Sequence, residues 1–305
     1  FYSALGRARS VYELDIDLEW DCTTSDIESL EFALRNSRVS ILRLDIQKYR
    51  TSIASRLLPT LTQYEAIFRI RDLPQVKVFH IVISYENIKF LGISPRASTH
   101  ASKISCELIV GASRRGDFGV ITRILKTNPT LTTLNFEFNN IEDDKAKILA
   151  EVLKTNSTLT TLNLAINNIR VDGASALAEA LKTNSTLTTL SLRANIIGDD
   201  GVKALAEALK TNSTLTTLNL KRNYFEVDGV RALAEALKIN STLVTLSVAS
   251  NNIGDDGTKA LVEALKTNST LVNLHLSSSF FGDDGTNALV EALMTNSRLR
   301  IMDDF

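Results

Sequence analysis

Cysteine is scarce in this chain: Cys22 and Cys106 are the only two among 305 residues. Two thiols cannot form the framework of a small disulfide-stapled secreted module, so we expect both to be reduced thiols of a cytoplasmic protein. The sequence also lacks any run of about 18 apolar residues, so no segment is expected to enter or cross a membrane. Residues 1–7 lack the apolar core of a signal peptide, which argues against secretion.

An excess of either charge is also missing. Thirty-four Lys and Arg residues are balanced by 35 Asp and Glu residues, which gives a formal net charge of −1. The chain therefore has no overall positive field to hold a nucleic acid. Apolar residues make up 44% of the sequence, which is enough for a core and excludes disorder of the whole chain. A length of 305 residues predicts about two domains, unless the chain is built from repeats.

Leucine, by contrast, recurs at a fixed spacing of 28 residues along much of the chain. The stretch 187–197 reads LTTLSLRANII, which is the pattern LxxLxLxxNxI. Its alternating side chains predict a short parallel strand with one side in the core and the other in solvent. The asparagine is expected to bond backbone groups where the strand ends. The leucines that open the repeats are Leu131, Leu159, Leu187, Leu215, Leu243, Leu271 and Leu299.

Each predicted strand is followed by a predicted helix. Gly198 and Gly201 flank a turn in which an aspartate is positioned to cap the next helix. Residues 202–210 carry Leu205 and Leu209 one helical turn apart, and the small alanines between them let neighbouring helices approach. Parallel strands lie about 4.8 Å apart and packed helices about 8–10 Å apart, so the stacked units are expected to bend into a horseshoe.

This repeat resembles the leucine-rich repeat of the ribonuclease-inhibitor-like class, which also occurs in nucleotide-binding leucine-rich-repeat receptors and in Ran GTPase-activating proteins. It is especially similar to the 28-residue arrays of fungal and protist proteins in which the phrase TNSTLTTL recurs. The resemblance implies an α/β solenoid, with a parallel β-sheet on the concave face and α-helices on the convex face.

The repeat is not equally regular along the chain. Residues 103–305 are expected to be regular repeats that are truncated or uncapped at the C-terminus, because the ends of a solenoid generally need a polar cap. Residues 1–102 are expected to be divergent, irregular repeats of the same solenoid. The elements predicted there are strands at 11–16, 39–44 and 76–83 and a helix over 25–34 that is N-capped by Ser25 or Asp26.

Patterns that could carry chemistry have simpler structural explanations. The segment 111–117 has the glycine spacing of a phosphate loop, but Asp117 stands where the essential lysine belongs, so no nucleotide is expected. Aspartate pairs at 199–200, 255–256 and 283–284 recur where a helix needs a cap, which favours capping over a metal site. We therefore expect no enzyme activity, no metal, no cofactor and no small-molecule ligand. The histidines are too dispersed for a metal-binding motif: His80, His100 and His275.

Five glycosylation sequons recur at the ends of the predicted helices. In a secreted protein they would accept glycans, so a secreted, glycosylated recognition protein is one alternative function. The preferred interpretation is structural, with each asparagine ending a helix in the left-handed backbone conformation that asparagine tolerates. The sequon asparagines are Asn156, Asn184, Asn212, Asn240 and Asn268.

Outward-facing residues that break the repeat are the candidate partner-binding residues. Arg193, Lys221 and Arg222 are expected on adjacent strands, where three like charges repel one another and are available to a carboxylate-rich or phosphorylated partner. Arginine and aromatic residues dominate the energetics of protein interfaces, so large side chains near the strand ends are included. The candidate set is Phe138, Ile166, Arg193, Lys221, Arg222, Tyr224, His275 and Phe280.

The sequence thus predicts a non-enzymatic scaffold, or the recognition segment of a larger receptor, that binds a protein of unknown identity on its concave face. A second alternative is a GTPase-activating protein resembling the Ran class, although no functional motif of that family maps onto this sequence. The repeats are also so alike that the variable residues are equally compatible with drift, because a fold alone assigns no partner.

Overall fold

The computed structural model describes residues 11–17, 24–46, 69–70, 73, 78–83, 107–109, 122, 125–126, 131–279 and 281–302. The chain divides into two compact units, Phe1–Asn135 and Phe136–Phe305, called here the first and the second unit. The predictions for Cys22, Cys106 and the segment 111–117 lie outside the described residues. Among the described stretches, no helix combines the length and the apolar character that a membrane span requires.

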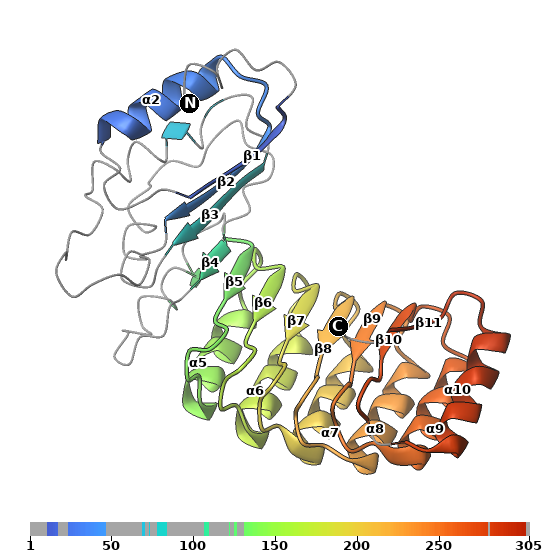
Figure 1. The fold of residues 1–305 in the computed structure, drawn as a ribbon. Helices are drawn as coiled ribbons and strands as arrows, with labels where there is room; N and C mark the ends of the chain where they lie inside the picture. The colour runs from blue at the N-terminus through green and yellow to red at the C-terminus, as the bar shows by residue number, and fades with distance from the viewer. Residues whose placement is uncertain are drawn as a thin grey trace. The chain divides into compact units, whose positions relative to one another are not determined.

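The first unit contains parallel strands that follow one another in chain order (Figure 1). Leu14 lies in register with Leu42, and Leu42 in turn with Phe79, so apolar positions of successive strands lie side by side in the sheet. The strands predicted near residues 11–16, 39–44 and 76–83 are therefore confirmed. The strands of this unit are β1 (Glu13–Asp17), β2 (Ile41–Ile46), β3 (Val78–Ile83), β4 (Glu107–Ile109) and β5 (Thr133–Asn135).

Helix α2 of the first unit spans Thr24–Arg35 and buries Leu34 completely. Glu31 on the same helix is 7% exposed and accepts hydrogen bonds from Arg35 Nη2 at 2.5 Å and Arg69 Nε at 3.0 Å. Burial by itself raises the pKa of Glu31, but the hydrogen bonds and charges of the two arginines outweigh burial and hold that pKa below its ordinary value of 4.5.

The start of α2 corrects one detail of the sequence analysis. Ser25 or Asp26 is predicted to be the N-cap, but the helix begins at Thr24, so both residues lie in its first turn. Asp26 there places a negative charge near the positive end of the helix dipole, which stabilises the helix without capping it.

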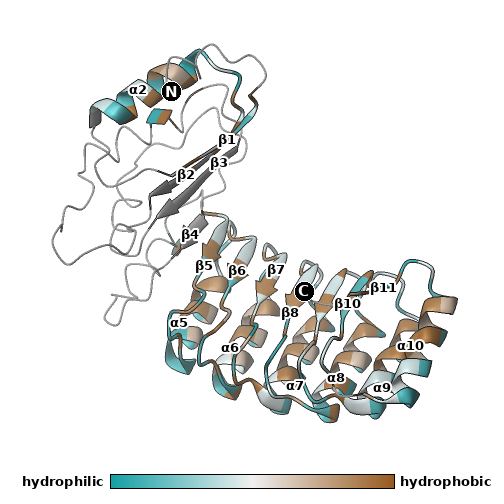
Figure 2. Cartoon of the chain, viewed as in Figure 1, coloured by the Kyte–Doolittle hydropathy of each residue, from teal (hydrophilic) through white to brown (hydrophobic). Residues whose placement is uncertain are grey.

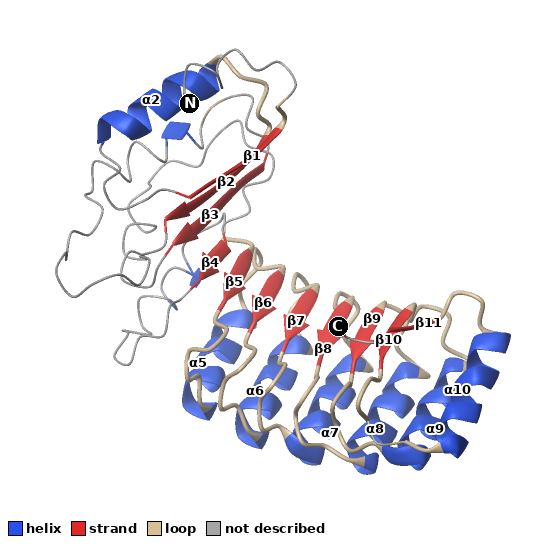
Figure 3. Cartoon of the chain, viewed as in Figure 1, coloured by secondary structure: helices blue, strands red, loops and turns tan. Residues whose placement is uncertain are grey.

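The second unit alternates short parallel strands with helices, and its strands line one side while its helices line the other (Figure 3). This arrangement confirms the predicted α/β solenoid of 28-residue units. The strands are β6 (Thr161–Asn163), β7 (Thr189–Ser191), β8 (Thr217–Asn219), β9 (Thr245–Ser247), β10 (Asn273–His275) and β11 (Arg300–Met302). The helices are α5 (Asp143–Leu153), α6 (Val171–Leu181), α7 (Gly198–Leu209), α8 (Val227–Leu237), α9 (Gly254–Leu265) and α10 (Asp283–Thr295).

The core of the second unit lies between its strands and its helices. We number the positions of a repeat from its opening leucine, so Leu187 is at position one. In that repeat Leu190, Leu192, Leu205 and Leu209 are at most 1% exposed. Figure 2 shows hydrophobic residues interleaved with hydrophilic ones along the helices, as expected for one buried side. Truncating such a leucine to alanine typically costs about 2–5 kcal/mol, so the leucine frame is the main source of stability.

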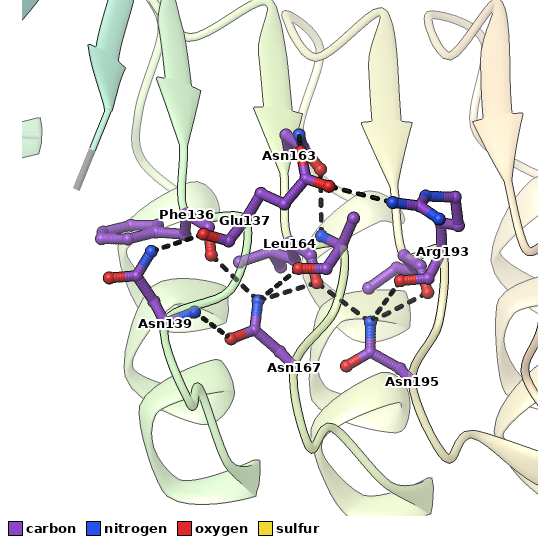
Figure 4. A network of polar contacts seen from close by, with 10 residues as sticks. Phe136, Glu137, Asn139, Asn163, Leu164, Asn167, Arg193 and Asn195 are labelled. Atoms are coloured by element: carbon purple, nitrogen blue, oxygen red, sulfur yellow. Dashed lines mark hydrogen bonds and ion pairs between the residues drawn. The ribbon is translucent and has the colours of Figure 1, made fainter. Parts of the chain in front are cut away.

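In five successive repeats an asparagine at position nine, from Asn139 to Asn251, lies just beyond the strand and links neighbouring repeats (Figure 4). The Nδ2 atom of Asn167 donates to the carbonyl oxygens of Phe136 and Leu164, each at 3.0 Å. Its Oδ1 atom accepts from the backbone N–H groups of Asn139 at 3.0 Å and Ile141 at 2.8 Å. The predicted role of this asparagine is confirmed, and its hydrogen bonds stabilise the stacking of one repeat on the next.

The sequon asparagines form a second set of cross-repeat bonds near the helix ends. Asn212 is 5% exposed, and its Nδ2 atom donates to the carbonyl oxygens of Leu181 at 2.7 Å and Asn184 at 3.3 Å. Its Oδ1 atom accepts from the backbone N–H groups of Thr214 at 3.1 Å and Leu215 at 2.8 Å. None of the five sequon asparagines has a positive φ, so the predicted left-handed conformation is wrong. Asn184, Asn212, Asn240 and Asn268 instead bridge two repeats.

Aspartates cap helices, as predicted, but the three that do so, Asp143, Asp199 and Asp255, cap the helix of the following repeat rather than their own. Asp199 Oδ1 accepts from the backbone N–H groups of Glu226 at 2.9 Å and Gly229 at 2.8 Å, which are the N-cap and third residues of α8. Asp143 and Asp255, at the same repeat position, make the equivalent bonds to α6 and α10. The unsatisfied donors of a helix start are therefore satisfied from the neighbouring repeat.

Candidate protein-binding face

The outward side of the second unit at its strand ends is formed by positions seven, eight and ten of the repeats, and we call this surface the strand face. Most of its residues are small or uncharged, so the few large side chains define its chemistry. Position seven holds Glu137, Ala165, Arg193, Lys221, Ala249 and Ser277; position eight holds Phe138, Ile166, Ala194, Arg222, Ser250 and Ser278; position ten holds Asn140, Asn168, Ile196, Tyr224 and Asn252 among the described residues.

Every described residue at position eight adopts the left-handed backbone conformation, with φ between 52° and 59°. Each residue from Phe138 to Ser250 in that position donates its N–H to the position-seven carbonyl of the next repeat; Phe138 donates to Ala165 at 3.0 Å and Ala194 to Lys221 at 2.7 Å. The turn therefore extends the hydrogen-bond ladder of the sheet beyond its strands. No repeat has glycine there, so no residue type indicates this conformation in advance.

Large residues at position eight destabilise the fold relative to glycine. The left-handed region costs a residue with a Cβ atom roughly 1–2 kcal/mol, and a β-branched residue such as Ile166 is a true outlier there. Phe138 is 66% exposed, so its ring gains little from burial in compensation. Arg222 is also exposed, and its side chain makes no ion pair with any residue that the structure describes. Residues held at such a cost on an exposed surface are candidates for function.

Arg193 is not the free cation that the sequence analysis predicts. Its Nη2 atom lies 2.9 Å from Glu137 Oε1, two repeats away (Figure 4). The pair spans Ala165, whose short side chain lies between them in position seven and is 2% exposed. Glu137 also accepts from Asn163 Nδ2 at 3.3 Å. The expectation of three repelling cations is therefore corrected, because Arg193 is neutralised by a partner 56 residues away.

The remaining candidate residues differ in how far they are exposed. Lys221 is half-buried beside the exposed Arg222, and Tyr224 of the same repeat is 77% exposed at a φ of 59°. His275 lies on the outward side of β10 and is half-buried, far along the array from Phe138. Phe280 lies outside the described residues. Their contact with a partner stays a prediction.

A metal site is not apparent in the part of the chain that the structure describes, since no three His, Cys, Asp or Glu side chains there are placed to hold an ion. The aspartates at the starts of the helices contribute instead to helix capping and to ion pairs between repeats. Lys147 Nζ lies 2.9 Å from Asp172 and Lys259 Nζ lies 2.6 Å from Asp284. Hydrogen bonding to these carboxylates raises the pKa of both lysines.

Two family models match parts of the chain. The TMOD/LMOD leucine-rich domain matches residues 165–248, and the leucine-rich repeat matches residues 127–144 and 240–262. No curated protein matches the sequence.

Solved structures with a similar fold include leiomodin-1 actin-binding site 2, which is 22% identical, with 60% of this chain and 91% of that chain covered and a TM-score of 0.40. A tropomodulin C-terminal domain from Caenorhabditis elegans is 18% identical, with 59% and 93% covered and a TM-score of 0.40. An internalin from Listeria monocytogenes is 16% identical, with 100% and 88% covered and a TM-score of 0.47. The repeated strand-and-helix units and the two family models identify the chain as a leucine-rich-repeat protein.

Proposed function

We propose that the chain is a non-enzymatic protein-binding module, a scaffold or recognition segment of the cytoplasm, that holds its partner on the strand face. Both matching family models describe leucine-rich repeats, and repeat solenoids in general present extended surfaces to protein partners. A grid of short strands displays residues from many repeats side by side, so a partner can contact several repeats at once. We also propose that its repeats belong to the ribonuclease-inhibitor-like class.

The observation that carries the proposal is the occupation of strained, exposed positions by large side chains. Phe138, Arg222 and Tyr224 all have a positive φ, and all three are exposed. In other repeats serine or alanine fills the eighth position of Phe138 and Arg222, and asparagine fills the tenth position of Tyr224, so the fold does not require large residues there. Aromatic and arginine side chains are the types that contribute most to binding at protein interfaces.

The alternative of a glycosylated recognition protein is weakened by the sequon geometry. A glycan attaches to the Nδ2 atom of asparagine. In four of the sequons this atom donates to two backbone carbonyls, and the asparagine is at most 6% exposed: Asn184, Asn212, Asn240 and Asn268. The folded chain thus hides these four acceptors. No observation favours a GTPase-activating role.

Affinity capture with purified chain as bait tests the proposal. The test variant combines Phe138→Ala, Arg222→Ala and Tyr224→Ala. We expect it to lose the proteins that wild type retains, as identified by mass spectrometry, because the exposed anchors are gone. Purified actin is included as one ligand, since one structure of similar fold is described as an actin-binding site.

A matched control keeps the strand face and alters the helix side. Ile148, Arg231 and Ile239 are exposed there and provide two apolar residues and one arginine, so their triple alanine variant removes a comparable set. We expect this control to retain the wild-type partners. Loss of the partners by the control, with retention by the strand-face variant, would place binding on the helix side and contradict the proposal.

A further inference from the structure

Helix α10 (Asp283–Thr295) presents to solvent a surface that every earlier helix of the second unit buries. At position twenty of the five preceding repeats the residue is at most 4% exposed, but Val290 is 47% exposed. At position twenty-three the preceding leucines are at most 3% exposed, but Leu293 is 41% exposed. We call Val290, Leu293 and the exposed Thr286 at position sixteen the α10 face. The buried counterparts are Ala146, Ala174, Val202, Val230 and Thr258; Ala150, Ala178, Ala206, Ala234 and Val262; and Leu153, Leu181, Leu209, Leu237 and Leu265.

The molecule itself shows what covers such a face, because in the preceding repeats the next helix packs on it. In three of these contacts an aspartate at position thirteen also caps that next helix. Asp143 caps α6, Asp199 caps α8 and Asp255 caps α10. The covering element is therefore a helix whose N-terminus lies at the aspartate.

Asp283 occupies position thirteen of the repeat that contains α10. Its carboxylate makes no hydrogen bond or ion pair with any residue in the described part of the chain. The position alternates between aspartate and valine in the earlier repeats, with Val171 and Val227 at the repeats that cap nothing. An aspartate instead of valine here supplies the same cap acceptor beside an uncovered helix face.

Met294 at position twenty-four indicates that the element covering the α10 face is not simply one more stacked repeat. The five preceding repeats have lysine at this position, and 30–46% of each lysine side chain stays in solvent although a repeat is stacked beside it. Lysine suits this partly exposed site because its aliphatic stem packs on the protein while its charged amine stays hydrated. Met294 is 83% exposed and has no charged end to hydrate, so it favours an occupant that covers more of α10 than a repeat does.

A covering helix that is capped by the aspartate of the preceding repeat requires glycine as its third residue. A Cβ atom on Gly173, Gly229 or Gly285 would lie 2.7–2.8 Å from the capping aspartate Oδ1, which is too close. Each of these glycines already has its aspartate. No other described helix of this chain has glycine as its third residue, so a second copy offers no suitable helix.

We propose that the α10 face binds an α-helix of a partner protein that carries glycine at its third residue and apolar residues along one side. Asp283 caps the N-terminus of this helix through the backbone N–H of its N-cap residue and of the glycine. Val290 and Leu293 pack against its apolar side, and a further apolar side chain of the helix covers Met294. This is recognition of an amphipathic helix by a complementary apolar surface.

The test uses the full 305-residue chain and a displayed library of helix-forming peptides. Peptides of about 20 residues are used because isolated helices shorter than about 12–15 residues are marginal in water. The third helical residue and the apolar side are randomised. We expect the selected binders to carry glycine at the third residue. Asp283→Ala is expected to weaken them about tenfold, as the loss of charge-assisted hydrogen bonds does.

Two lysine substitutions separate the possible occupants. Leu293→Lys is expected to abolish binding of the selected peptides. Met294→Lys is expected to weaken their binding about tenfold, because the peptide side chain that packs on Met294 then loses its apolar contact. Ile148→Lys, on the exposed side of α5, is the matched control and is expected to bind as wild type does. Unchanged melting curves confirm that the variants fold, since all three residues are exposed in the wild type.

Three results would overturn the proposal. One is a library that yields no binders, and another is binders that survive Leu293→Lys. Binders that tolerate Met294→Lys fully would fit one more stacked repeat rather than a partner helix.

Discussion

The cross-repeat cap between Asp199 and Gly229 leads to a prediction in which two substitutions compensate each other. A Cβ atom on Gly229 would lie 2.8 Å from Asp199 Oδ1 and 3.3 Å from the Cβ atoms of Phe225 and Val202. Alanine there must therefore displace the carboxylate and break both hydrogen bonds that the carboxylate accepts. The effect of Gly229→Ala on stability therefore depends on whether the Asp199 carboxylate is present.

Magnitudes follow from the separate contributions. Asp199→Ala loses the cap of α8 and is expected to destabilise the fold by about 1–2 kcal/mol. Gly229→Ala alone loses the same cap and introduces crowding, but gains about 0.5–1 kcal/mol from the greater helix propensity of alanine, so a net loss of about 1 kcal/mol is expected. In the double variant the cap is already absent, so Gly229→Ala is expected to be neutral or slightly stabilising. The coupling energy is then about 1–2 kcal/mol.

Urea unfolding followed by circular dichroism measures all four free energies. Gly257→Ala serves as the matched control, because the nearest atom to its Cβ is Ile253 Cβ at 3.3 Å and no carboxylate lies close. Its effect is expected to be the same with and without Asp199. Additivity of Asp199→Ala and Gly229→Ala within about 0.5 kcal/mol would refute the cross-repeat cap as the reason for the glycine.

Three further substitutions test other contacts. Asn212→Ala is expected to destabilise the fold by about 2–4 kcal/mol because it removes four hydrogen bonds, two of which reach the preceding repeat. Ser213→Ala, at an exposed site, is expected to leave the urea midpoint unchanged, and equal effects of the two substitutions would contradict the bridging role. Arg193→Glu is expected to lower the free energy of unfolding by about 1 kcal/mol because the new carboxylate repels Glu137, whereas Arg222→Glu is expected to leave the melting temperature unchanged. No loss of stability with Arg193→Glu would contradict the ion pair. Because the pKa of Glu31 is lowered in the folded chain, Glu31 stabilises the fold at pH values above its ordinary pKa of 4.5, and this contribution is lost as the pH falls through the folded pKa. Glu31→Gln is therefore expected to flatten the acid side of the pH–stability profile, and an unchanged profile would argue against the arginine pairs.

The fold was largely predictable because its information is local and repeated. The 28-residue leucine frame determines which side chains are buried, so the strands, the helices and the core positions follow from spacing alone. The position-nine asparagine was also predictable, since an asparagine at a strand end has backbone groups within reach. The glycines at position fifteen, such as Gly229, gave no hint that a neighbouring repeat fills their space.

The candidate site was less predictable because its decisive features join residues of different repeats. Arg193 looks unpaired beside Lys221 in the sequence, and only the three-dimensional arrangement shows that a short Ala165 lets it reach Glu137. The left-handed turn at Phe138 has no glycine to reveal it. Repeat spacing identifies which residues face outward, but it does not show which of them neutralise each other or which are strained.

Binding on the strand face is tested most directly by the dissociation constant of a captured partner, measured by titration calorimetry with purified chain. Relative to wild type, the variant with Phe138→Ala, Arg222→Ala and Tyr224→Ala is expected to bind at least about 100-fold more weakly, since each interface anchor contributes about 1–2 kcal/mol or more. The helix-side control is expected to bind within about twofold of wild type, as near-neutral surface substitutions do. A strand-face variant with wild-type affinity, together with a weakened control, would contradict the proposed binding face.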